Sequence, residues 1–390
     1  MTRIAFIGAG AISGIYLQNI CGMFREIEIA GVCDLIPERA EKAAAYILEE
    51  TGKRVNVYAD MQKAFDDPAV DVILNLTRPA EHFAVTKAAL LCGKHVYSEK
   101  PLAVDMDEAN ALFALAREKN LRLGGAPDTF LGAGIQTCRR IIDAGLIGRL
   151  IGADCAMICR GHETWHPDPE FYYTRGGGPM MDMGPYYISA LLNLLGRAKS
   201  VTGVTRRGFD NRIITSKPHF GENITVTADT HAAGCIEFDS GAVAQLITTF
   251  DAHYTTQARF EVYGSEGTLV VPDPNTFGGP ILLFRREDGE AAKTDPALLK
   301  PEEISLYRGY RQLPLMFGYR DNSRGLGLAD MCKAIETGRP HRANSVQQLH
   351  VMEIMTAFTV SSKERRFVDL TTDYVREAPM VNSGLAGVLD

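Results

Sequence analysis

The sequence of 390 residues lacks the features that point to a membrane, to nucleic acid or to secretion. No apolar stretch approaches the roughly 18 residues that a membrane-spanning helix needs. Basic residues are in the minority, since 41 Lys and Arg stand against 48 Asp and Glu, and a net charge of −7 disfavours binding to a phosphate backbone. A strand is expected from residue 3, which leaves no room for a signal peptide. We therefore expect a cytoplasmic protein without membrane or nucleic-acid partners.

The eight cysteines lack the paired spacings of a disulfide framework or a zinc site. Cys155 and Cys159, followed by His162 and His166, come nearest to a set of metal ligands. On a strand, however, a spacing of four puts two thiols on the same face without bringing them together. We expect reduced thiols and no metal site.

Length and patterning predict two domains, residues 1–125 and 126–390, without a Gly/Ser-rich linker. In the first, short apolar strands alternate with helices, which is typical of a doubly wound parallel sheet. The second has longer strands joined by tight turns, which predicts an α+β domain with a large open, mostly antiparallel sheet. The expected strands are Arg3–Ile7, Glu28–Cys33, Val55–Tyr58, Val70–Leu76, His95–Ser98 and Leu121–Gly125, then Leu150–Cys159, Val201–Phe209, Ile224–Phe238, Ala242–Phe250, Ala258–Tyr263 and Thr268–Val271.

A glycine-rich turn follows the first expected strand. Residues 4–14 read Ile-Ala-Phe-Ile-Gly-Ala-Gly-Ala-Ile-Ser-Gly, and glycines at such a turn let the chain bend sharply and approach a pyrophosphate closely. The helix that follows offers free N–H groups to the phosphates. Ser13 occupies the third position of the fingerprint, where glycine or alanine is usual. The residues expected to contact a dinucleotide are Gly8, Gly10, Ala11 and Ile12.

Asp34 closes the second expected strand, 20 residues beyond Gly14. At this distance from the turn, a carboxylate hydrogen-bonds the hydroxyls of the adenosine ribose. The same carboxylate would repel a 2′-phosphate, and no Arg follows it directly, although Arg39 comes one helical turn later. The sequence therefore favours NAD over NADP as the cofactor.

Lys100 lies two residues past the fifth expected strand, between Glu99 and Pro101. Ligands of open parallel sheets bind outside the carboxyl ends of the strands, so the Lys100 ammonium would lie beside a bound nicotinamide, with Glu99 also near the cofactor. Pro101 restricts the backbone of Lys100 to extended conformations, which fixes the direction of its side chain.

A second group of candidates follows three glycines at 176–178. The helix expected from Gly178 or Pro179 to about Leu195 places Asp182 and Tyr186 four residues apart, on one face. With Lys100 this set supplies a proton acceptor, a cation and an orienting carboxylate. Either Tyr186 moves the proton of a substrate hydroxyl while Lys100 lowers its pKa, or Lys100 is the acid/base and Tyr186 a hydrogen-bond partner. The sequence leaves both open.

These motifs resemble those of the glucose-fructose oxidoreductase, inositol dehydrogenase and rhizopine-catabolism (Gfo/Idh/MocA) family over nearly the whole length. The resemblance implies an N-terminal Rossmann domain, and a C-terminal domain whose open sheet builds homodimers or homotetramers. It implies hydride transfer between a nicotinamide cofactor and a sugar, polyol or related carbonyl. It also assigns Lys100 as the catalytic lysine and Asp182 as the site carboxylate, and it places Thr77, Pro79 and His82 along the cofactor.

The sequence departs from the family pattern at two places. Many members have His where this chain has Tyr186, and others have Tyr there, so the role of a histidine at that position is absent or changed. Many also have an Asn-Arg-Arg-like segment after the sixth strand, where this chain has Pro127-Asp128-Thr129-Phe130. The contacts that the family makes from that segment are therefore in doubt here.

Substrate-binding candidates lie just before the three glycines. His162, Trp165 and His166 combine imidazoles with the only Trp of the chain, and these groups suit the hydroxyls and C–H faces of a carbohydrate. Anchoring of a long loop is an equally good explanation of the Trp. Asp128 and Arg175 are weaker candidates for hydroxyl or carboxylate recognition.

Together these features predict an NAD-dependent oxidoreductase that acts on a secondary alcohol or carbonyl of a sugar, inositol or sugar derivative. Two alternatives stay open. Retained NAD could support a redox-neutral elimination or cleavage, or the chain could be a non-catalytic NAD-binding sensor, although Lys100, Asp182 and Tyr186 argue against the latter.

Overall fold

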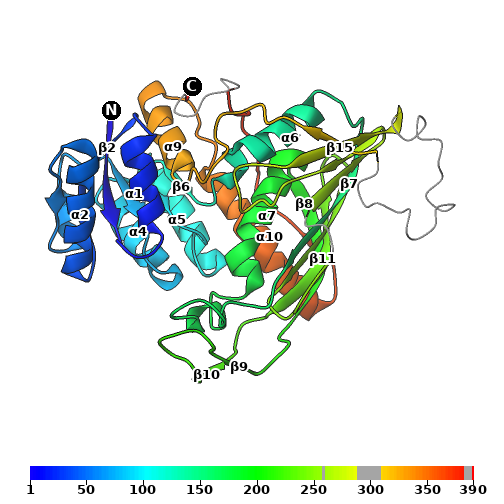
Figure 1. Cartoon of the computed structure of the whole chain (residues 1–390), viewed down its shortest axis with the longest axis horizontal. Helices are drawn as coiled ribbons and strands as arrows, with labels where there is room; N and C mark the ends of the chain where they lie inside the picture. The colour runs from blue at the N-terminus through cyan, green and yellow to red at the C-terminus, as the bar shows by residue number, and fades with distance from the viewer. Residues whose placement is uncertain (257–259, 288–308, 382–388) are drawn as a thin grey trace.

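Two β-sheets lie at opposite ends of the molecule, with helices packed between and around them (Figure 1). The computed structural model describes residues 1–256, 260–287, 309–381 and 389–390. None of the helices in this part of the chain is long and apolar enough to cross a membrane.

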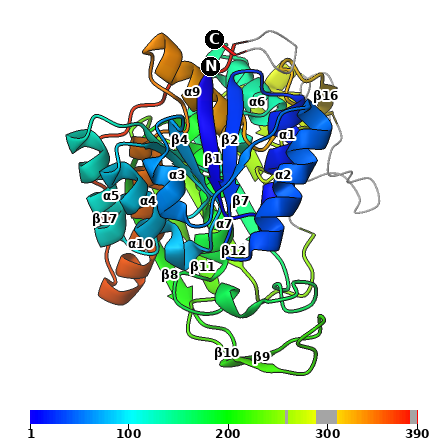
Figure 2. The same cartoon turned by 90° about the vertical axis from the view of Figure 1, so that its left-hand side faces the viewer.

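The N-terminal sheet has six parallel strands in the order β3-β2-β1-β4-β5-β6, which confirms the predicted doubly wound sheet. β1 lies between helices that cover both faces (Figure 2), so Ile4, Ala5 and Phe6 are fully buried. The order reverses between β1 and β4, where open α/β sheets bind ligands. The elements are β1 Thr2–Ile7, α1 Ser13–Gly22, β2 Ile27–Cys33, α2 Pro37–Thr51, β3 Asn56–Val57, α3 Met61–Asp66, β4 Val72–Asn75, α4 His82–Leu91, β5 His95–Ser98, α5 Met106–Glu118 and β6 Leu123–Gly125.

The second sheet has nine strands in the order β16-β15-β14-β13-β7-β12-β11-β8-β17. Its strands pair antiparallel except for β7 with β12, so the prediction of a large, mostly antiparallel sheet is confirmed. The strands are β7 Leu150–Ile158, β8 Ala198–Arg206, β11 His231–Phe238, β12 Val243–Thr249, β13 Phe260–Gly264, β14 Gly267–Val270, β15 Ile281–Arg285, β16 Arg311–Leu313 and β17 Val368–Asp369.

One expected strand is wrong in its extent. The run Ile224–Phe238 is two strands, β10 (Asn223–Thr225) and β11, because the chain between them leaves the sheet. There the N–H groups of Thr227 and Ala228 donate to the carbonyl of Tyr173. β10 pairs instead with β9 (Asn211–Ile213) in a separate hairpin, seen at the bottom of Figure 1. The start of the strand expected from Ala258 lies outside the described residues.

Helix α7 (Pro179–Leu195) connects the second sheet to the site. It is buried along most of its length and packs on β7, β11 and β12. Gly178 precedes it with φ +90°, and a Cβ there would lie 2.4 Å from the carbonyl oxygen of Asp229, so a glycine is needed at this start. The first turn of α7 carries Asp182, which lies next to Lys100, just past the end of β5 in the first sheet.

The C-terminal helices cross between the two sheets. α9 (Leu326–Thr337) packs on β1 and β6, and α10 (Ser345–Glu364) packs on α5 and β6 as well as on β8. Residues late in the chain thus complete the core of the first domain. The predicted boundary between residues 125 and 126 separates the two sheets, but α9 and α10 come after it in the chain and still pack on the first domain. This boundary stays a prediction.

Asp128 holds the start of α9 against the segment after β6. Its side chain is buried, and Oδ2 accepts hydrogen bonds of 2.9 Å from the backbone N–H groups of Gly325 and Gly327. Burial raises the pKa of this carboxyl to about 6, although the bonds from the two glycines oppose the shift. The substrate-binding role expected for Asp128 stays a prediction without support in this arrangement, because the carboxylate is enclosed and bonded to backbone.

We predict that Asp128→Ala destabilises the protein by about 1–3 kcal/mol, because two buried N–H groups lose their acceptor. Asp128→Asn should cost less, since its amide oxygen accepts the same bonds without a desolvated charge. Thermal unfolding of both variants checks this. A melting temperature equal to the wild type for Asp128→Ala would contradict the capping role.

Candidate active site

The glycine turn after β1 is built for close approach. Gly8 has φ +100°, and a Cβ there would lie 2.7 Å from the carbonyl oxygen of Leu76. A Cβ at Gly10, by contrast, would have no heavy atom within 4 Å, so its outer side is open. Helix α1 begins at Ser13 without a side-chain cap and without an acidic residue in its first turn, which leaves its N–H groups for an anion.

Two further side chains fit the turn to a dinucleotide. Ser13 is buried and its Oγ donates to the carbonyl of Gly10 at 2.7 Å, which explains how serine is accommodated at the third fingerprint position. Asp34 accepts from the N–H of Ala9 at 2.7 Å and from that of Ile36 at 2.8 Å. Its carboxylate thus stands beside the turn, at the end of β2, where the ribose of a dinucleotide binds.

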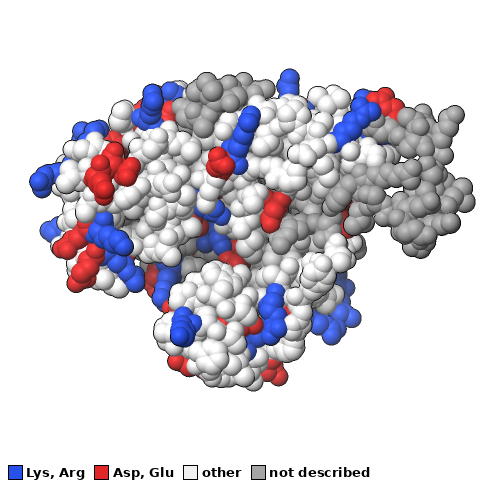
Figure 3. Space-filling model, viewed as in Figure 1, with Lys and Arg blue, Asp and Glu red and all other residues white. Residues whose placement is uncertain are grey.

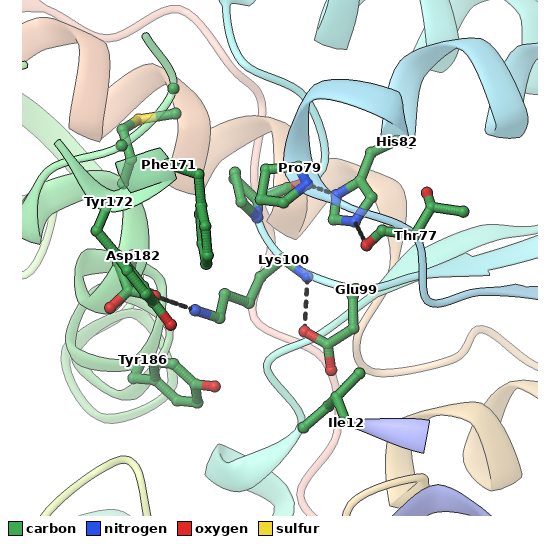
Figure 4. Close-up of a pocket in the computed structure, with 14 residues that line it drawn as sticks. Ile12, Thr77, Pro79, His82, Glu99, Lys100, Phe171, Tyr172, Asp182 and Tyr186 are labelled. Atoms are coloured by element: carbon green, nitrogen blue, oxygen red, sulfur yellow. Dashed lines mark hydrogen bonds and ion pairs between the residues drawn. The ribbon is translucent and has the colours of Figure 1, made fainter. Parts of the chain in front are cut away.

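A pocket of about 250 Å³ lies between the two domains, at the carboxyl edge of the first sheet (Figure 4). Residues from both domains line it, including the predicted Ile12, Thr77, Pro79, His82, Glu99, Lys100, Asp182 and Tyr186. The sequence motifs did not predict the other lining residues, namely Pro101, Phe171, Tyr172, Gly176, Gly177 and Met181.

His82 and Glu99 fix the backbone around Lys100. The two ring nitrogens of the buried His82 face the carbonyls of Pro101, at 2.7 Å, and Thr77, at 3.0 Å. His82 therefore ties the loop after β4 to the loop after β5. Glu99 accepts from the hydroxyl of Tyr16 at 2.8 Å and from the N–H of Lys100 at 3.0 Å.

Lys100 and Asp182 form an ion pair across the domain boundary. The Lys100 Nζ lies 2.5 Å from Asp182 Oδ1 and 2.8 Å from the backbone carbonyl oxygen of Asp182. Burial alone would lower the pKa of Lys100, but the charge of Asp182 outweighs it and the pKa is raised. Burial likewise opposes ionisation of Asp182, yet Lys100 and His162 bring its pKa down to about 2. Both groups are therefore charged at neutral pH.

Tyr186 lies on the same face of α7 as Asp182. The Lys100 Nζ is 5.3 Å from the centre of its ring. Burial raises the pKa of the Tyr186 hydroxyl, and the nearby cations Lys100 and Arg324 offset this only in part. No sequence motif predicted Arg324, which hydrogen-bonds the Tyr186 hydroxyl from the residue before the N-cap of α9.

The loop after β7 adds an imidazole to the pair. His162 Nε2 lies 3.0 Å from Asp182 Oδ2, and His162 Nδ1 accepts from the indole Nε1–H of Trp165 at 3.1 Å. Trp165 itself is 60% exposed, and His166 packs beside Phe171 and Tyr172. Of these candidates, none is among the residues that line the described pocket.

Arg175 does not point into the pocket. Its guanidinium is largely exposed and pairs with Asp105 at 2.9 Å, at the start of α5. Its expected role in substrate recognition stays a prediction that this arrangement does not support. A second exposed pair, Arg78 with Asp168 at 2.8 Å, also joins the two domains.

Comparisons with known proteins agree with this geometry. A family described as "Oxidoreductase family, NAD-binding Rossmann fold" matches residues 2–125, and the "GFO/IDH/MocA C-terminal domain" matches residues 135–270. Together the two matches cover most of the chain.

Curated relatives and solved structures are similar over most of their length. D-xylose dehydrogenase of Paenarthrobacter nicotinovorans is 23% identical over 337 residues, 83% of each chain. 1,5-anhydro-D-fructose reductase of Ensifer adhaerens is 28% identical over 321 residues, 79% of this chain and 87% of its own. The structure of levoglucosan dehydrogenase in complex with NADH has a TM-score of 0.77 at 21% identity, and the match covers 95% of this chain and 99% of that one. The chain therefore belongs to the Gfo/Idh/MocA family of oxidoreductases and has an NAD-binding Rossmann domain at its N-terminus.

Proposed function

We propose that this protein transfers a hydride between NAD and a secondary alcohol or carbonyl of a neutral sugar, polyol or sugar derivative. The observation that carries the proposal is the Lys100–Asp182 pair in a pocket at the carboxyl edge of the Rossmann sheet. Relatives whose names denote action on D-xylose and 1,5-anhydro-D-fructose support the substrate class. No observation in the described structure favours a redox-neutral reaction or a sensor.

The residues at the glycine turn fit the cofactor. The pyrophosphate would lie against the open side of Gly10 and accept hydrogen bonds from the free N–H groups of α1. The Asp34 carboxylate would accept hydrogen bonds from the hydroxyls of the adenosine ribose. Thr77 and Pro79 would lie along the nicotinamide half, because they line the pocket next to Lys100. When bound, the nicotinamide ring supplies the chemistry of accepting or returning the hydride.

Lys100 is the better candidate to carry the proton. Its ammonium has three N–H groups, and Asp182 accepts from it through a carboxylate and a backbone oxygen. This leaves the third N–H to donate to a substrate oxygen. In the direction of carbonyl reduction, the Lys100 ammonium gives its proton to the substrate oxygen as the hydride arrives at the carbon. In alcohol oxidation Lys100 must first release a proton, and the Asp182 carboxylate, which raises the pKa of Lys100, opposes that release. Tyr186, whose pKa is raised, is assigned as a hydrogen-bond partner of the same oxygen.

The lining of the pocket suits an uncharged ring. The rings of Phe171 and Tyr172 lie 4.0 Å apart, centre to centre, and Figure 4 shows the Phe171 ring extending toward the end of the Lys100 side chain. Such aromatic faces pack against the C–H face of a sugar. Lys100 is the single Lys or Arg among the lining residues described, and Asp182 already balances its charge. A carboxylate or phosphate on the substrate would find no free cation there.

We predict that an assay of NADH formation across neutral sugars and polyols identifies a substrate. With that substrate, Lys100→Met should lower kcat by ~10²- to 10⁴-fold, as loss of a proton-transfer group does. Tyr186→Phe should lower kcat by about tenfold, the value of one hydrogen bond. A larger loss in Tyr186→Phe than in Lys100→Met would reverse the two roles. Absence of NADH formation with every neutral candidate, alongside turnover of sugar acids, would overturn the substrate class.

Cofactor preference follows from Asp34. We predict that NAD binds at least about tenfold more tightly than NADP, because the carboxylate repels a 2′-phosphate. Asp34→Ser should narrow the difference, mainly by improving NADP binding. Isothermal titration calorimetry measures both dissociation constants, and a thermal melt confirms that the glycine turn survives loss of the bonds to Ala9 and Ile36. Equal wild-type affinities for the two cofactors would refute the preference.

A homodimer or homotetramer through the second sheet is also proposed. The face turned away from α10 carries an apolar row in register across β7, β12, β11 and β8, formed by Ala156, Ile247, Ala233 and Val204. α10 covers the opposite face, where Phe358 packs on Gly203 and Gly234. On the molecular face in Figure 3, charges of both signs are interspersed. A cytoplasmic location stays a prediction from the sequence.

We predict that Ile247→Arg converts the oligomer to monomers, because the charge interrupts the apolar row. Light scattering after size-exclusion chromatography measures the mass. Leu91→Arg, at an apolar residue of α4 that is 54% exposed, is the matched control and should leave the mass unchanged. A wild-type protein that is monomeric at micromolar concentration would contradict the proposal.

A further inference from the structure

His162 lies between two groups that together decide which ring nitrogen of the neutral imidazole carries the proton. An indole N–H can only donate a hydrogen bond, so the Nδ1 atom that accepts from Trp165 at 3.1 Å carries no proton. The proton of the neutral ring is then on Nε2, which lies 3.0 Å from Asp182 Oδ2. A continuous chain of hydrogen bonds therefore runs from Trp165 through His162 and Asp182 to Lys100.

His162 is held in this place by buried groups of its own loop. The hydroxyl of Tyr173 accepts from the His162 backbone N–H at 3.0 Å and donates to the neighbouring Glu163. Glu163 pairs with the buried Arg212, which comes from β9 and also pairs with Asp251. The His162 ring is enclosed by Tyr172, at 4.2 Å between ring centres, and Phe250, at 4.7 Å. The imidazole is thus oriented without any contribution from a substrate.

We propose that His162 is a positioning residue, which holds the Asp182 carboxylate in the orientation that receives the Lys100 ammonium. The proposal rests on the proposed function, because it assigns a role relative to Lys100. Each oxygen of Asp182 has one side-chain partner, Oδ1 with Lys100 and Oδ2 with His162. Without the Nε2–H, Oδ2 would be a mostly buried acceptor that lacks its donor, and the carboxylate would be free to turn away from Lys100.

Trp165 acts one step further out. Its indole occupies Nδ1 and thereby selects the tautomer that donates to Asp182. The substrate-binding role expected for His162 and Trp165 is replaced by this one. The other titratable groups that face Asp182 are Tyr172 and His166 from the loop and Tyr186 from α7. Their shifts leave the tyrosines and His166 neutral at neutral pH, so Lys100 is the cation that the carboxylate meets.

Two substitutions separate the hydrogen bond from the packing of the ring. His162→Phe keeps a ring between Tyr172 and Phe250 but has no N–H. His162→Gln keeps a donor near the Nε2 position but has no ring. We predict that His162→Phe lowers kcat by ~10- to 100-fold with little change in KM, the usual size of a positioning effect, whereas His162→Gln stays within severalfold of the wild type. His219→Phe, at an exposed histidine, is the matched control.

The pH profile adds a readout that loss of packing alone would not move. The donor lowers the pKa of Asp182, so its removal raises that pKa. The acid limb of kcat/KM should therefore shift to higher pH in His162→Phe and not in His162→Gln. A larger loss of activity in His162→Gln than in His162→Phe, or unchanged activity in both, would overturn the proposal.

A spectroscopic measurement tests the arrangement independently of turnover. Trp165 is the only tryptophan of the chain, so a ¹⁵N-labelled sample gives one indole N–H resonance. This resonance should move in His162→Phe and stay in place in His219→Phe. An unmoved resonance in His162→Phe would overturn the pairing. If the wild type turns over no alcohol or carbonyl substrate, the proposed function fails, and the resonance still decides whether His162 holds this position.

Discussion

The site depends on the ion pair between Lys100 and Asp182, because each domain contributes one of the two charged groups and neither domain forms the pair alone. Lys100 comes from the loop after β5 of the Rossmann sheet, and Asp182 comes from the first turn of α7 against the second sheet. Both side chains are mostly buried. A buried charge without its partner is strongly unfavourable, so the pair favours the closed arrangement in which the pocket exists.

Such a pair is stable only if the remaining polar atoms around it are also bonded. Around Lys100, the Glu99 carboxylate accepts hydrogen bonds from the Tyr16 hydroxyl and the Lys100 backbone N–H. His82 contacts the carbonyls of Thr77 and Pro101 and so joins the two loops that carry them. On the Asp182 side, His162 bonds the carboxylate, and the buried Arg212 holds the His162 loop through Glu163. Each member of the pair is therefore held in position by its own set of hydrogen-bonded residues, Lys100 by groups of the first domain and Asp182 by the loop after β7.

The sequence predicted the parts of the site that short motifs define. Gly8, Asp34 and Lys100 could be placed because each follows a strand whose position in a parallel sheet determines where its end lies. Asp182 and Tyr186 could be joined because helical spacing alone puts them on one face. The capping role of Asp128 could not be predicted, because its partners, Gly325 and Gly327, are almost 200 residues away. Phe171 and Tyr172 lie beyond the motif around Trp165, and the available signal was an aromatic run at 171–173, separated by two residues from the three glycines. Arg212 and Arg324 gave no local signal, because only the tertiary fold brings them to the site.

The departure at Tyr186 shows why the partners of a carboxylate must be found in space rather than by position in a motif. Many members of the family have histidine four residues after the aspartate, whereas here a tyrosine occupies that position and Arg324 reaches its hydroxyl. The imidazole beside Asp182 comes instead from the loop after β7, 20 residues earlier in the chain. Because the raised pKa of Tyr186 keeps its hydroxyl protonated near neutrality, a tyrosine there can orient a substrate oxygen but is a weak base. Lys100 is protonated near neutrality as well, so the proposed assignment of the proton to Lys100 rests on geometry: Asp182 accepts two of its three N–H groups and leaves one for a substrate oxygen. In that proposal, His162 contributes by keeping the Asp182 carboxylate turned toward Lys100.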